Sequence, residues 1–375
     1  TLRSEGVGAT IRWLLLPSGK PVRASLSRYR SCLSAVPVLM GLILIVQPAP
    51  DLSAAAQERQ VSDHFDGKRF HNDVPEHSFP DMVRWLWEMK TVEWPEWIED
   101  PKQPAPEKQC NGSRLRVTYV NHATMLIQTD GLNILTDPIW STVAGPSSWL
   151  GVKRVRLPGV TMEDLPKIDV ILLSHDHYDH LDMPTLKQIA ARDNPLIIAG
   201  LGIRNILKPD VAGTIIELDW WEVYEIQPGD MRLTFVPSLH ESGRGIMSHN
   251  ETLWGGFVME GRAGRIYFAG DTGYGSFLDA LRKRYDRFRL TIFPVGSYEK
   301  RWFMKSRHMN PDDAVKAHIL LGSQQSIGMH FSTFAEHPEQ TIDAHEHDLA
   351  AALVGHGLDA SRFRILRFGE GIDIP

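Results

Sequence analysis

The stretch "SHDHYDHLD", Ser174 to Asp182, places three histidines among several aspartates. Neutral imidazole and carboxylate are the ligands that borderline divalent ions such as zinc prefer, and histidine-rich tracts are metal-binding candidates. His175 and His177 alternate, and Asp179 and His180 follow at once. This spacing suits a loop around two neighbouring ions better than one face of a helix, so the stretch predicts a metal site in a loop.

Other histidines and aspartates stand just after apolar runs. "IDVILLS" leads into His175, "LTFVPS" runs on to His240, "RIYFAG" precedes Asp271, and "SIGM" precedes His330. These continuous runs are typical of strands buried on both faces. Sites in sheets covered by helices form at the carboxyl ends of strands. The four strand ends therefore predict a single site.

The runs upstream are shorter and alternate. "LRVTYV", "TMLIQT" and "LNILTD" are rich in Val, Ile and Thr and separated by turn residues such as Asp130–Gly131, which predicts antiparallel strands. Helices intervene later. The clearest runs from Asn310 to Leu321, with Asn310 as the cap, Pro311 in the first turn and Gly322 as the stop.

The first residues differ in kind from the rest of the 375-residue chain, whose hydrophobic content is 42%. Basic residues precede an apolar run of 14 residues, "LSAVPVLMGLILIV", and Ala54 and Ala56 form an A-x-A cleavage site. We interpret residues 1–56 as an export leader, or signal peptide, with an uncleaved membrane anchor as the alternative. The predicted location is exported, periplasmic or membrane-associated, after cleavage near Ala56.

Net charge and cysteine content argue against two classes of protein. The leader carries six Lys or Arg against two acidic residues, so its removal takes the formal charge from −6 to −10. Such an acidic chain is a poor candidate for nucleic-acid binding, which needs clustered Lys and Arg. Cys32 lies in the leader, which leaves Cys110 alone. A disulfide framework is excluded.

Residues 57–109 form a Trp- and Pro-rich arm that precedes a catalytic domain at 110–375. In "SFPDMVRWLWEMKTVEWPEW", Phe79, Met82, Val83 and Leu86 fall at helical spacing and predict a short amphipathic helix. Two interpretations stay open. The arm packs on the main core, or it presents an aromatic surface to lipid.

These motifs resemble a known family. "HDHYDH" matches the HxHxDH signature of the metallo-β-lactamase fold superfamily. The phrases "HATMLIQTDGLNILTDPIWS", "ELDWWE", "FAGDTGY", "RWFMKSRHMNPDDAV" and "MHFSTFA" narrow the resemblance to the N-acyl-phosphatidylethanolamine-hydrolysing phospholipase D family. The resemblance implies an α/β fold, an αββα sandwich of two mixed sheets flanked by helices. It also implies two Zn²⁺ ions as cofactors and suggests a homodimer.

The same resemblance implies roles for single residues. One zinc ion would be held by His175, His177 and His240. The other would be held by Asp179, His180 and His330, with Asp271 bridging the two. His308 matches a family position outside this ligand set, and we assign it with Asp271 as a catalytic residue, one that meets the substrate phosphate or the leaving oxygen.

The residue types fit this chemistry without the family. Two neighbouring ions lower the pKa of a bridging water, which makes hydroxide available as the nucleophile, and stabilise charge on a phosphoryl oxygen. Trp220, Trp221 and Trp254 line an acyl-chain channel or belong to the core. Arg244 is a candidate for holding phosphate. For His122, a buried structural role competes with a contact to a metal ligand.

The leading hypothesis is a dizinc phosphodiesterase of the phospholipase D type. It would hydrolyse N-acyl-phosphatidylethanolamine to N-acylethanolamine and phosphatidic acid, with peripheral membrane association following from the phospholipid substrate. A second hypothesis keeps the metals and changes the substrate to another phosphodiester, a lactone or a β-lactam, because one site serves many clefts. A third is a non-catalytic lipid-binding protein.

Overall fold

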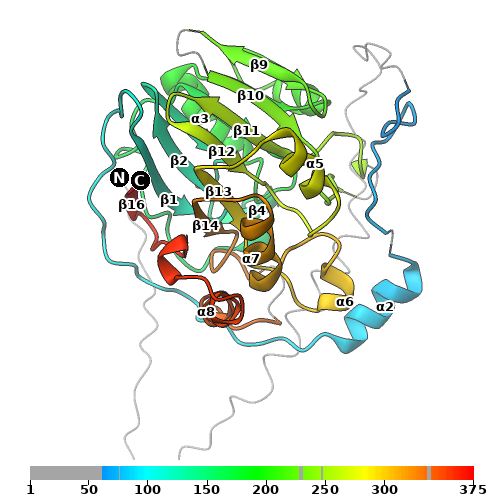
Figure 1. The fold of residues 1–375 in the computed structure, drawn as a ribbon. Helices are drawn as coiled ribbons and strands as arrows, with labels where there is room; N and C mark the ends of the chain where they lie inside the picture. The colour runs from blue at the N-terminus through cyan, green and yellow to red at the C-terminus, as the bar shows by residue number, and fades with distance from the viewer. Residues whose placement is uncertain (1–60, 76, 228–230, 246–247, 336–338) are drawn as a thin grey trace, which may run out of the picture. The chain divides into compact units, whose positions relative to one another are not determined.

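The first sheet combines an antiparallel and a parallel half. It is part of a computed structural model that describes residues 61–75, 77–227, 231–245, 248–335 and 339–375. Its strand order is β16-β1-β2-β3-β6-β7-β8, and Figure 1 labels β16, β1 and β2 side by side. Strands β1 to β3 pair antiparallel, as their alternating pattern predicts, and β3, β6, β7 and β8 pair parallel. The bounds are β1 Leu115–Asn121, β2 Thr124–Thr129, β3 Leu132–Thr136, β6 Val170–Leu173, β7 Leu196–Gly200, β8 Ile215–Leu218 and β16 Gly371–Ile374.

The second sheet repeats this plan, with the order β15-β14-β13-β12-β11-β10-β9. Strands β9 to β12 pair antiparallel and β12 to β15 pair parallel. The bounds are β9 Val223–Ile226, β10 Met231–Val236, β11 Gly256–Gly261, β12 Gly264–Phe268, β13 Leu290–Pro294, β14 Gln325–Met329 and β15 Phe363–Arg364. A two-stranded sheet, β4 Val143–Ser147 with β5 Leu150–Lys153, stands apart.

Side-chain alternation explains why the sheets stack. On β6, Val170 and Leu172 face the core shared with the second sheet, while Ile171 and Leu173 face a second core. Alternate residues of a strand point to opposite faces, so a strand of this kind must be covered on both sides. The second core holds α3 (Met183–Asp193) and α4 (Ile203–Leu207), and the second sheet packs with α5 (Phe277–Arg284), α7 (Pro311–Leu320) and α8 (Ala344–Gly355). The predicted αββα sandwich is confirmed.

The helices begin and end where local chemistry dictates. Asn310 caps α7, its side chain accepting a hydrogen bond from the backbone N–H of Asp313, and Pro311 takes the first turn. Gly322 follows with a positive φ of 61°, which stops the helix as predicted. The bounds are α2 Phe79–Glu88, α3 Met183–Asp193, α4 Ile203–Leu207, α5 Phe277–Arg284, α6 Arg301–Met304, α7 Pro311–Leu320, α8 Ala344–Gly355 and the 3₁₀ turn η3 Ala360–Arg362.

The predicted helix of the arm, α2, lies beside α6 (Figure 1). Trp85 stacks on Phe303, with 4.9 Å between ring centroids. The opposite side faces solvent, since Phe79 is 78% exposed and Trp87 is 90% exposed. Packing on the core and an open apolar face therefore occur on the same helix, and neither interpretation of the arm excludes the other.

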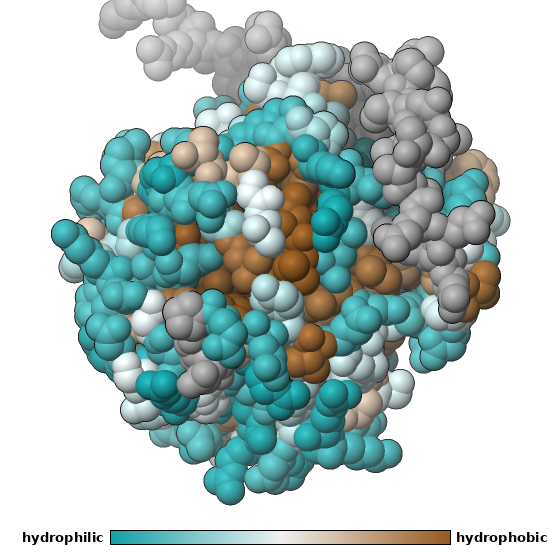
Figure 2. Space-filling model, turned by 90° about the horizontal axis from the view of Figure 1, so that it is seen from above, coloured by the Kyte–Doolittle hydropathy of each residue, from teal (hydrophilic) through white to brown (hydrophobic). Residues whose placement is uncertain are grey.

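The predicted export leader, residues 1–56, lies outside the described residues. Searched along the described residues, the chain has no helix both long and apolar enough to cross a bilayer. On the face seen in Figure 2, hydrophobic side chains gather in a band bordered by hydrophilic residues.

Candidate metal centre

The candidate ligands stand at the carboxyl ends of strands from both sheets. His175 follows β6, Asp271 follows β12 and His330 follows β14 directly, while His240 lies in the loop after β10. A glycine makes room at one of these ends. Gly270 has a φ of 60°, and a Cβ there would lie 2.7 Å from the Cβ of Ser174. The two sheets can therefore bring their strand ends together only with glycine at this position.

Three histidines form the first cluster. The Nδ1 atom of His177 lies 2.9 Å from Nε2 of His175 and 3.3 Å from Nε2 of His240. The other nitrogens of two of these rings are engaged elsewhere: Nδ1 of His175 lies 2.9 Å from Ser174 Oγ, and Nδ1 of His240 lies 3.2 Å from the carbonyl of Arg307. Because those bonds place the ring proton on Nδ1 in His175 and His240, each Nε2 atom directs a lone pair toward His177. A cation among these lone pairs would stabilise the arrangement.

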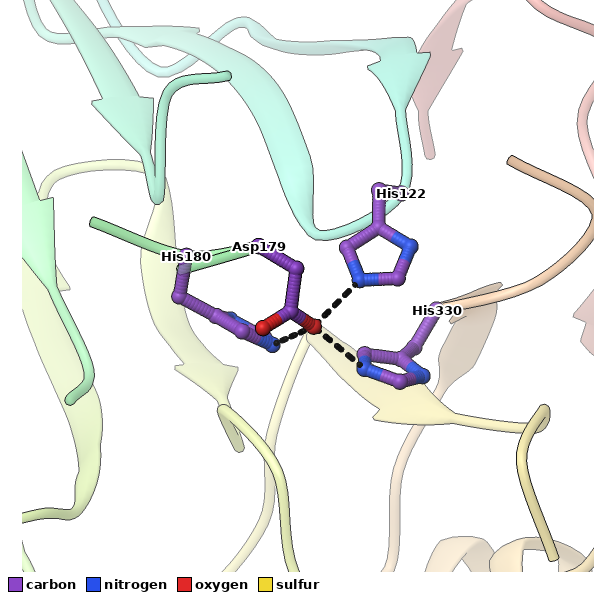
Figure 3. A group of neighbouring side chains, drawn as sticks. All are labelled: His122, Asp179, His180 and His330. Atoms are coloured by element: carbon purple, nitrogen blue, oxygen red, sulfur yellow. Dashed lines mark hydrogen bonds and ion pairs between the residues drawn. The ribbon is translucent and has the colours of Figure 1, made fainter. Parts of the chain in front are cut away.

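The second cluster surrounds Asp179, as Figure 3 shows. Its Oδ2 atom lies 3.2 Å from Nε2 of His180 and 3.3 Å from Nε2 of His330. His122 donates a hydrogen bond of 2.8 Å from Nε2 to the same oxygen. His122 thus contacts a candidate metal ligand, which is the second of the two roles considered for it.

Asp271 lies between the clusters. Its Oδ2 atom is 3.0 Å from Nε2 of His330, 3.2 Å from Nε2 of His180 and 3.9 Å from Nε2 of His240. One carboxylate oxygen therefore faces both groups. The structure brings together all seven ligands predicted from the sequence, in the two groups that the resemblance implies.

The donors fit divalent metal ions. Among the described residues, Nε2 of His180, Nε2 of His330 and Oδ1 of Asp271 are buried without a hydrogen-bond partner. Buried polar atoms are nearly always satisfied, so unsatisfied atoms that converge on one point require an explanation. Imidazole nitrogens and carboxylate oxygens are the ligand set of zinc and related ions. The side chains can hold metal, and their types do not specify which ion or how many.

The charges of the centre are strongly coupled. Burial alone would lower the pKa of His330, but the carboxylates of Asp271 and Asp179 together outweigh it and raise that pKa to about 10. Burial would raise the pKa of Asp271, but His330 and His180 hold it well below its usual range. Burial, helped by the neighbouring His330, lowers the pKa of His122 to about 3. The apo centre therefore holds a proton on His330 that a metal ion would displace.

Asp137 positions two ligands and was not singled out by sequence reasoning. It is fully buried at the end of β3. It accepts hydrogen bonds from Nδ1 of His180 at 2.8 Å, from the backbone N–H of Ser174 at 2.7 Å and from Ser174 Oγ at 2.6 Å. The Ser174 hydroxyl in turn accepts from His175, so one carboxylate fixes ligands of both clusters. Its place at a strand end was the signal that could have found it.

His308 lies at the edge of the centre. Its Nδ1 atom is 3.9 Å from Oδ2 of Asp271, and its ring centroid is 5.1 Å from that of His240. Arg301 holds the backbone there by donating a 2.9 Å hydrogen bond to the carbonyl of His308. The resemblance put His308 outside the ligand set, whereas in the structure His308 forms, with His240 and Asp271, a group of side chains that could itself hold a metal ion.

Arg244 requires a correction. The sequence offered it as a phosphate-holding residue, but Nη1 donates to the carbonyls of Asp176 and Leu181, both at 2.9 Å, and the guanidinium lies 3.9 Å from the ring centroid of Tyr178. Burial lowers the pKa of Arg244, although Tyr178 opposes the change. Because Nη1 is turned to carbonyls of the histidine-rich loop, Arg244 positions that loop.

The three tryptophans considered for an acyl-chain channel lie in different environments. Trp254 is 1% exposed and donates to the carbonyl of Ser238, so it belongs to the core and cannot line an open channel. Trp220 is half-buried, stacks on His64 of the arm at 4.6 Å and donates to the carbonyl of Trp254. Trp221 is half-buried beneath the guanidinium of Arg284 at 5.3 Å. A substrate contact remains a prediction for Trp220 and Trp221 alone.

Several known proteins are similar to this chain in sequence or in fold. Residues 132–331 match the model of the β-lactamase superfamily domain. The N-acyl-phosphatidylethanolamine-hydrolyzing phospholipase D 1 of Caenorhabditis elegans is 39% identical over 59% of this chain, and the chain spans 65% of that relative, just under two thirds. An uncharacterized protein of Mycobacterium tuberculosis is 35% identical over 68% of this chain and 70% of its own. A metallo hydrolase of Ignicoccus hospitalis has a similar fold, with a TM-score of 0.54 and 19% identity over 70% of this chain and 99% of its own.

Proposed function

Since this chain belongs to the β-lactamase superfamily, we propose that it is a metal-dependent phosphodiesterase of the phospholipase D type, which cleaves N-acyl-phosphatidylethanolamine to N-acylethanolamine and phosphatidic acid. The observation that carries the proposal is the pair of ligand clusters that share the carboxylate of Asp271. The substrate comes from the 39% identity to a relative with that activity in its name.

The ligand groups have distinct tasks. Two divalent ions, zinc in our proposal, would supply Lewis acidity at the phosphoryl oxygen and lower the pKa of water. Asp137 accepts a hydrogen bond from Nδ1 of His180, which keeps the Nε2 lone pair of His180 directed at the other ligands. His122 donates a hydrogen bond to Asp179 and fixes the position of that carboxylate. With these bonds in place the ligand atoms need little reorganisation during the reaction.

His308 stands where the leaving group needs a proton. It is buried, it approaches Asp271 to 3.9 Å, and Arg301 fixes its backbone. Phosphodiester cleavage leaves an alkoxide on the departing alcohol, and a positioned imidazolium can protonate it. We assign to His308 the donation of that proton to the ethanolamine oxygen.

A phospholipid substrate also requires apolar contact surface. The exposed face of α2 carries Phe79, Met82, Val83 and Trp87. Exposed apolar patches rimmed by polar residues are typical of membrane and ligand contacts. We propose peripheral association with a phospholipid surface after export of the chain.

The test is turnover of the purified chain, reconstituted with zinc, on N-acyl-phosphatidylethanolamine in mixed micelles, with products resolved by mass spectrometry. We expect N-acylethanolamine and phosphatidic acid, and loss of both products in Asp271→Asn. Asp312→Asn, an acidic residue on α7 that pairs with Lys316, is the matched control and should retain turnover.

An intact lipid in the presence of stoichiometric bound metal would refute the substrate. A panel containing a lactone, a β-lactam and a phosphodiester chromogen would then identify the bond that the centre cleaves, because the metal chemistry and the cleft are separable.

A further inference from the structure

A second cavity lies apart from the metal centre, between α8 and the chain that leads into β16. Its volume is about 490 Å³. Its apolar lining includes five buried side chains, Phe331, Leu349, Leu353, Leu366 and Phe368. Pockets of this size hold drug-sized ligands, and they bind best where an apolar wall carries a few placed polar groups.

One buried polar side chain completes this groove. His345 of α8 is 5% exposed and stacks on Phe331, with 4.2 Å between ring centroids. Its Nε2 atom has no hydrogen-bond partner among the described residues. The nearest carboxylate oxygen, on Glu346 of the groove rim, is 4.0 Å away. A buried nitrogen without a partner is costly, and a ligand in the groove would satisfy it.

The chemistry of His345 selects the ligand's head group. Its imidazole hydrogen-bonds to the backbone of Ile342, which assigns the ring proton to Nδ1 and leaves Nε2 as a lone pair. Burial, and next the charge of Arg156, lower the pKa of His345 to about 4, so the ring is neutral at pH 7. A neutral acceptor of this kind requires a donor from the ligand.

The rim disfavours anions. It carries three acidic residues, Asp100, Asp343 and Glu346, against Arg156 and Arg367. Both arginines are already paired, Arg156 with Asp100 at 3.1 Å and Arg367 with Glu370 at 3.5 Å. A carboxylate or phosphate head group would lose water without gaining a free cation.

We propose that this groove binds a single-chain amphiphile whose neutral head group carries a hydroxyl or an amide N–H. The chain lies on the apolar floor, and the head group donates its proton to Nε2 of His345. N-acylethanolamines, monoacylglycerols and fatty alcohols share this chemistry. The site is independent of the proposed reaction.

The groove is nevertheless close to the metal centre. Phe331 of its floor follows His330 directly in the chain. A cavity of about 20 Å³, lined by His122, His330, Phe331 and His345, lies between the two sites. That volume accommodates one water molecule, so the groove and the centre are separate compartments.

Binding is measured by calorimetry on the full chain, with oleoyl ethanolamide, oleyl alcohol and oleate as probes below their aggregation concentrations. We expect the first two to bind and oleate to bind at least tenfold more weakly. Comparison of the ethanolamide with the alcohol distinguishes an N-acylethanolamine site from a general hydroxyl site. Oleate binding as tight as that of the alcohol overturns the head-group argument.

Two variants locate the site. His345→Phe keeps a ring against Phe331 and removes the acceptor, so the Kd for oleyl alcohol should rise roughly five- to tenfold, the loss of one hydrogen bond. Ala350→Trp, on the exposed rim, should block the groove without touching the core. Val354→Ala, 81% exposed on the same helix, is the control and should bind like the wild type. Unchanged Kd in both Ala350→Trp and His345→Phe would overturn the proposal.

Discussion

Replacing Asp137 by alanine should weaken metal binding although Asp137 is not a predicted ligand. The substitution removes three hydrogen bonds, one from His180 and two from Ser174. His180 would then be free to turn or to adopt the other tautomer, and Ser174 would no longer fix His175. Loss of such an orienting partner typically costs 10- to 100-fold in metal affinity, about 1.4–2.7 kcal/mol.

Stability should fall as well. Three buried hydrogen bonds contribute roughly 0.5–1.5 kcal/mol each, and the Ser174 N–H would remain buried without a partner at about 1–3 kcal/mol. We therefore expect a loss of about 3–6 kcal/mol in the free energy of unfolding of the metal-free protein. Asp137→Asn, which keeps one oxygen acceptor in the same volume, should fall between alanine and wild type.

The assay is competition for zinc against a chromogenic chelator, paired with denaturant unfolding of the metal-free protein. Asp286→Ala, which removes a carboxylate 71% exposed at the surface, serves as the control and should change neither quantity. An Asp137→Ala protein that folds and binds zinc within threefold of the wild type would refute the reasoning that this carboxylate orients the ligands.

Three further outcomes are expected. His122→Ala removes the 2.8 Å bond to Asp179, so zinc affinity in the same competition should fall about tenfold, and an unchanged affinity would contradict that role. The pKa of His330, raised to about 10, adds stability that is complete below the unfolded value of about 6.5 and is lost as pH rises through about 10. The unfolding free energy of the metal-free protein should therefore decline from pH 7 to 10, and His330→Ala should make that decline smaller; the part that persists comes from His180, whose pKa the carboxylates of Asp271 and Asp179 also raise against the effect of burial. Arg244→Ala frees two loop carbonyls and should lower the free energy of unfolding by about 2–3 kcal/mol in denaturant titrations, whereas weaker substrate binding at unchanged stability would restore the phosphate-binding role.

The strands could be predicted because the order of apolar and polar residues within each short segment indicates them. Alternation in β1 to β3 predicted antiparallel pairing, and the continuous runs at β6, β13 and β14 predicted strands buried on both faces; the structure confirms both predictions. Strands β1 to β3 are also buried on both faces, which their alternation did not predict. His175 and His330 were predictable for the same reason, because each follows one of those runs, whereas the assignment of Asp179 and His180 to one ion came from the family resemblance.

Long-range contacts were not encoded in this way. Asp137 meets His180 across 43 positions of the chain, and His122 meets Asp179 across 57, so neither partnership has a local signal. Arg244 shows a second limit. Its basic character fits a phosphate, but the direction of its guanidinium depends on the fold of the histidine-rich loop.

The arm shows that a periodic pattern predicts a helix without predicting its neighbours. The spacing of apolar residues from Phe79 predicted the helix, and the capping box at Ser78 explains why it begins there. The face that contacts α6 is set by Trp85 and Phe303, which are far apart in sequence. Phe79, Met82, Val83 and Trp87 stay exposed, so a large part of the apolar surface of this helix is left open to solvent.

The two sheets repeat one plan, and each contributes separate metal ligands. His175 to His180 come from the first half of the chain, and His240, Asp271 and His330 come from the second. An ion bound by ligands of both sheets would link the two halves of the chain, and its full ligand set would form only after both halves have folded. Metal binding would therefore favour the state in which both sheets are folded together, so removal of the metal should lower the free energy of unfolding.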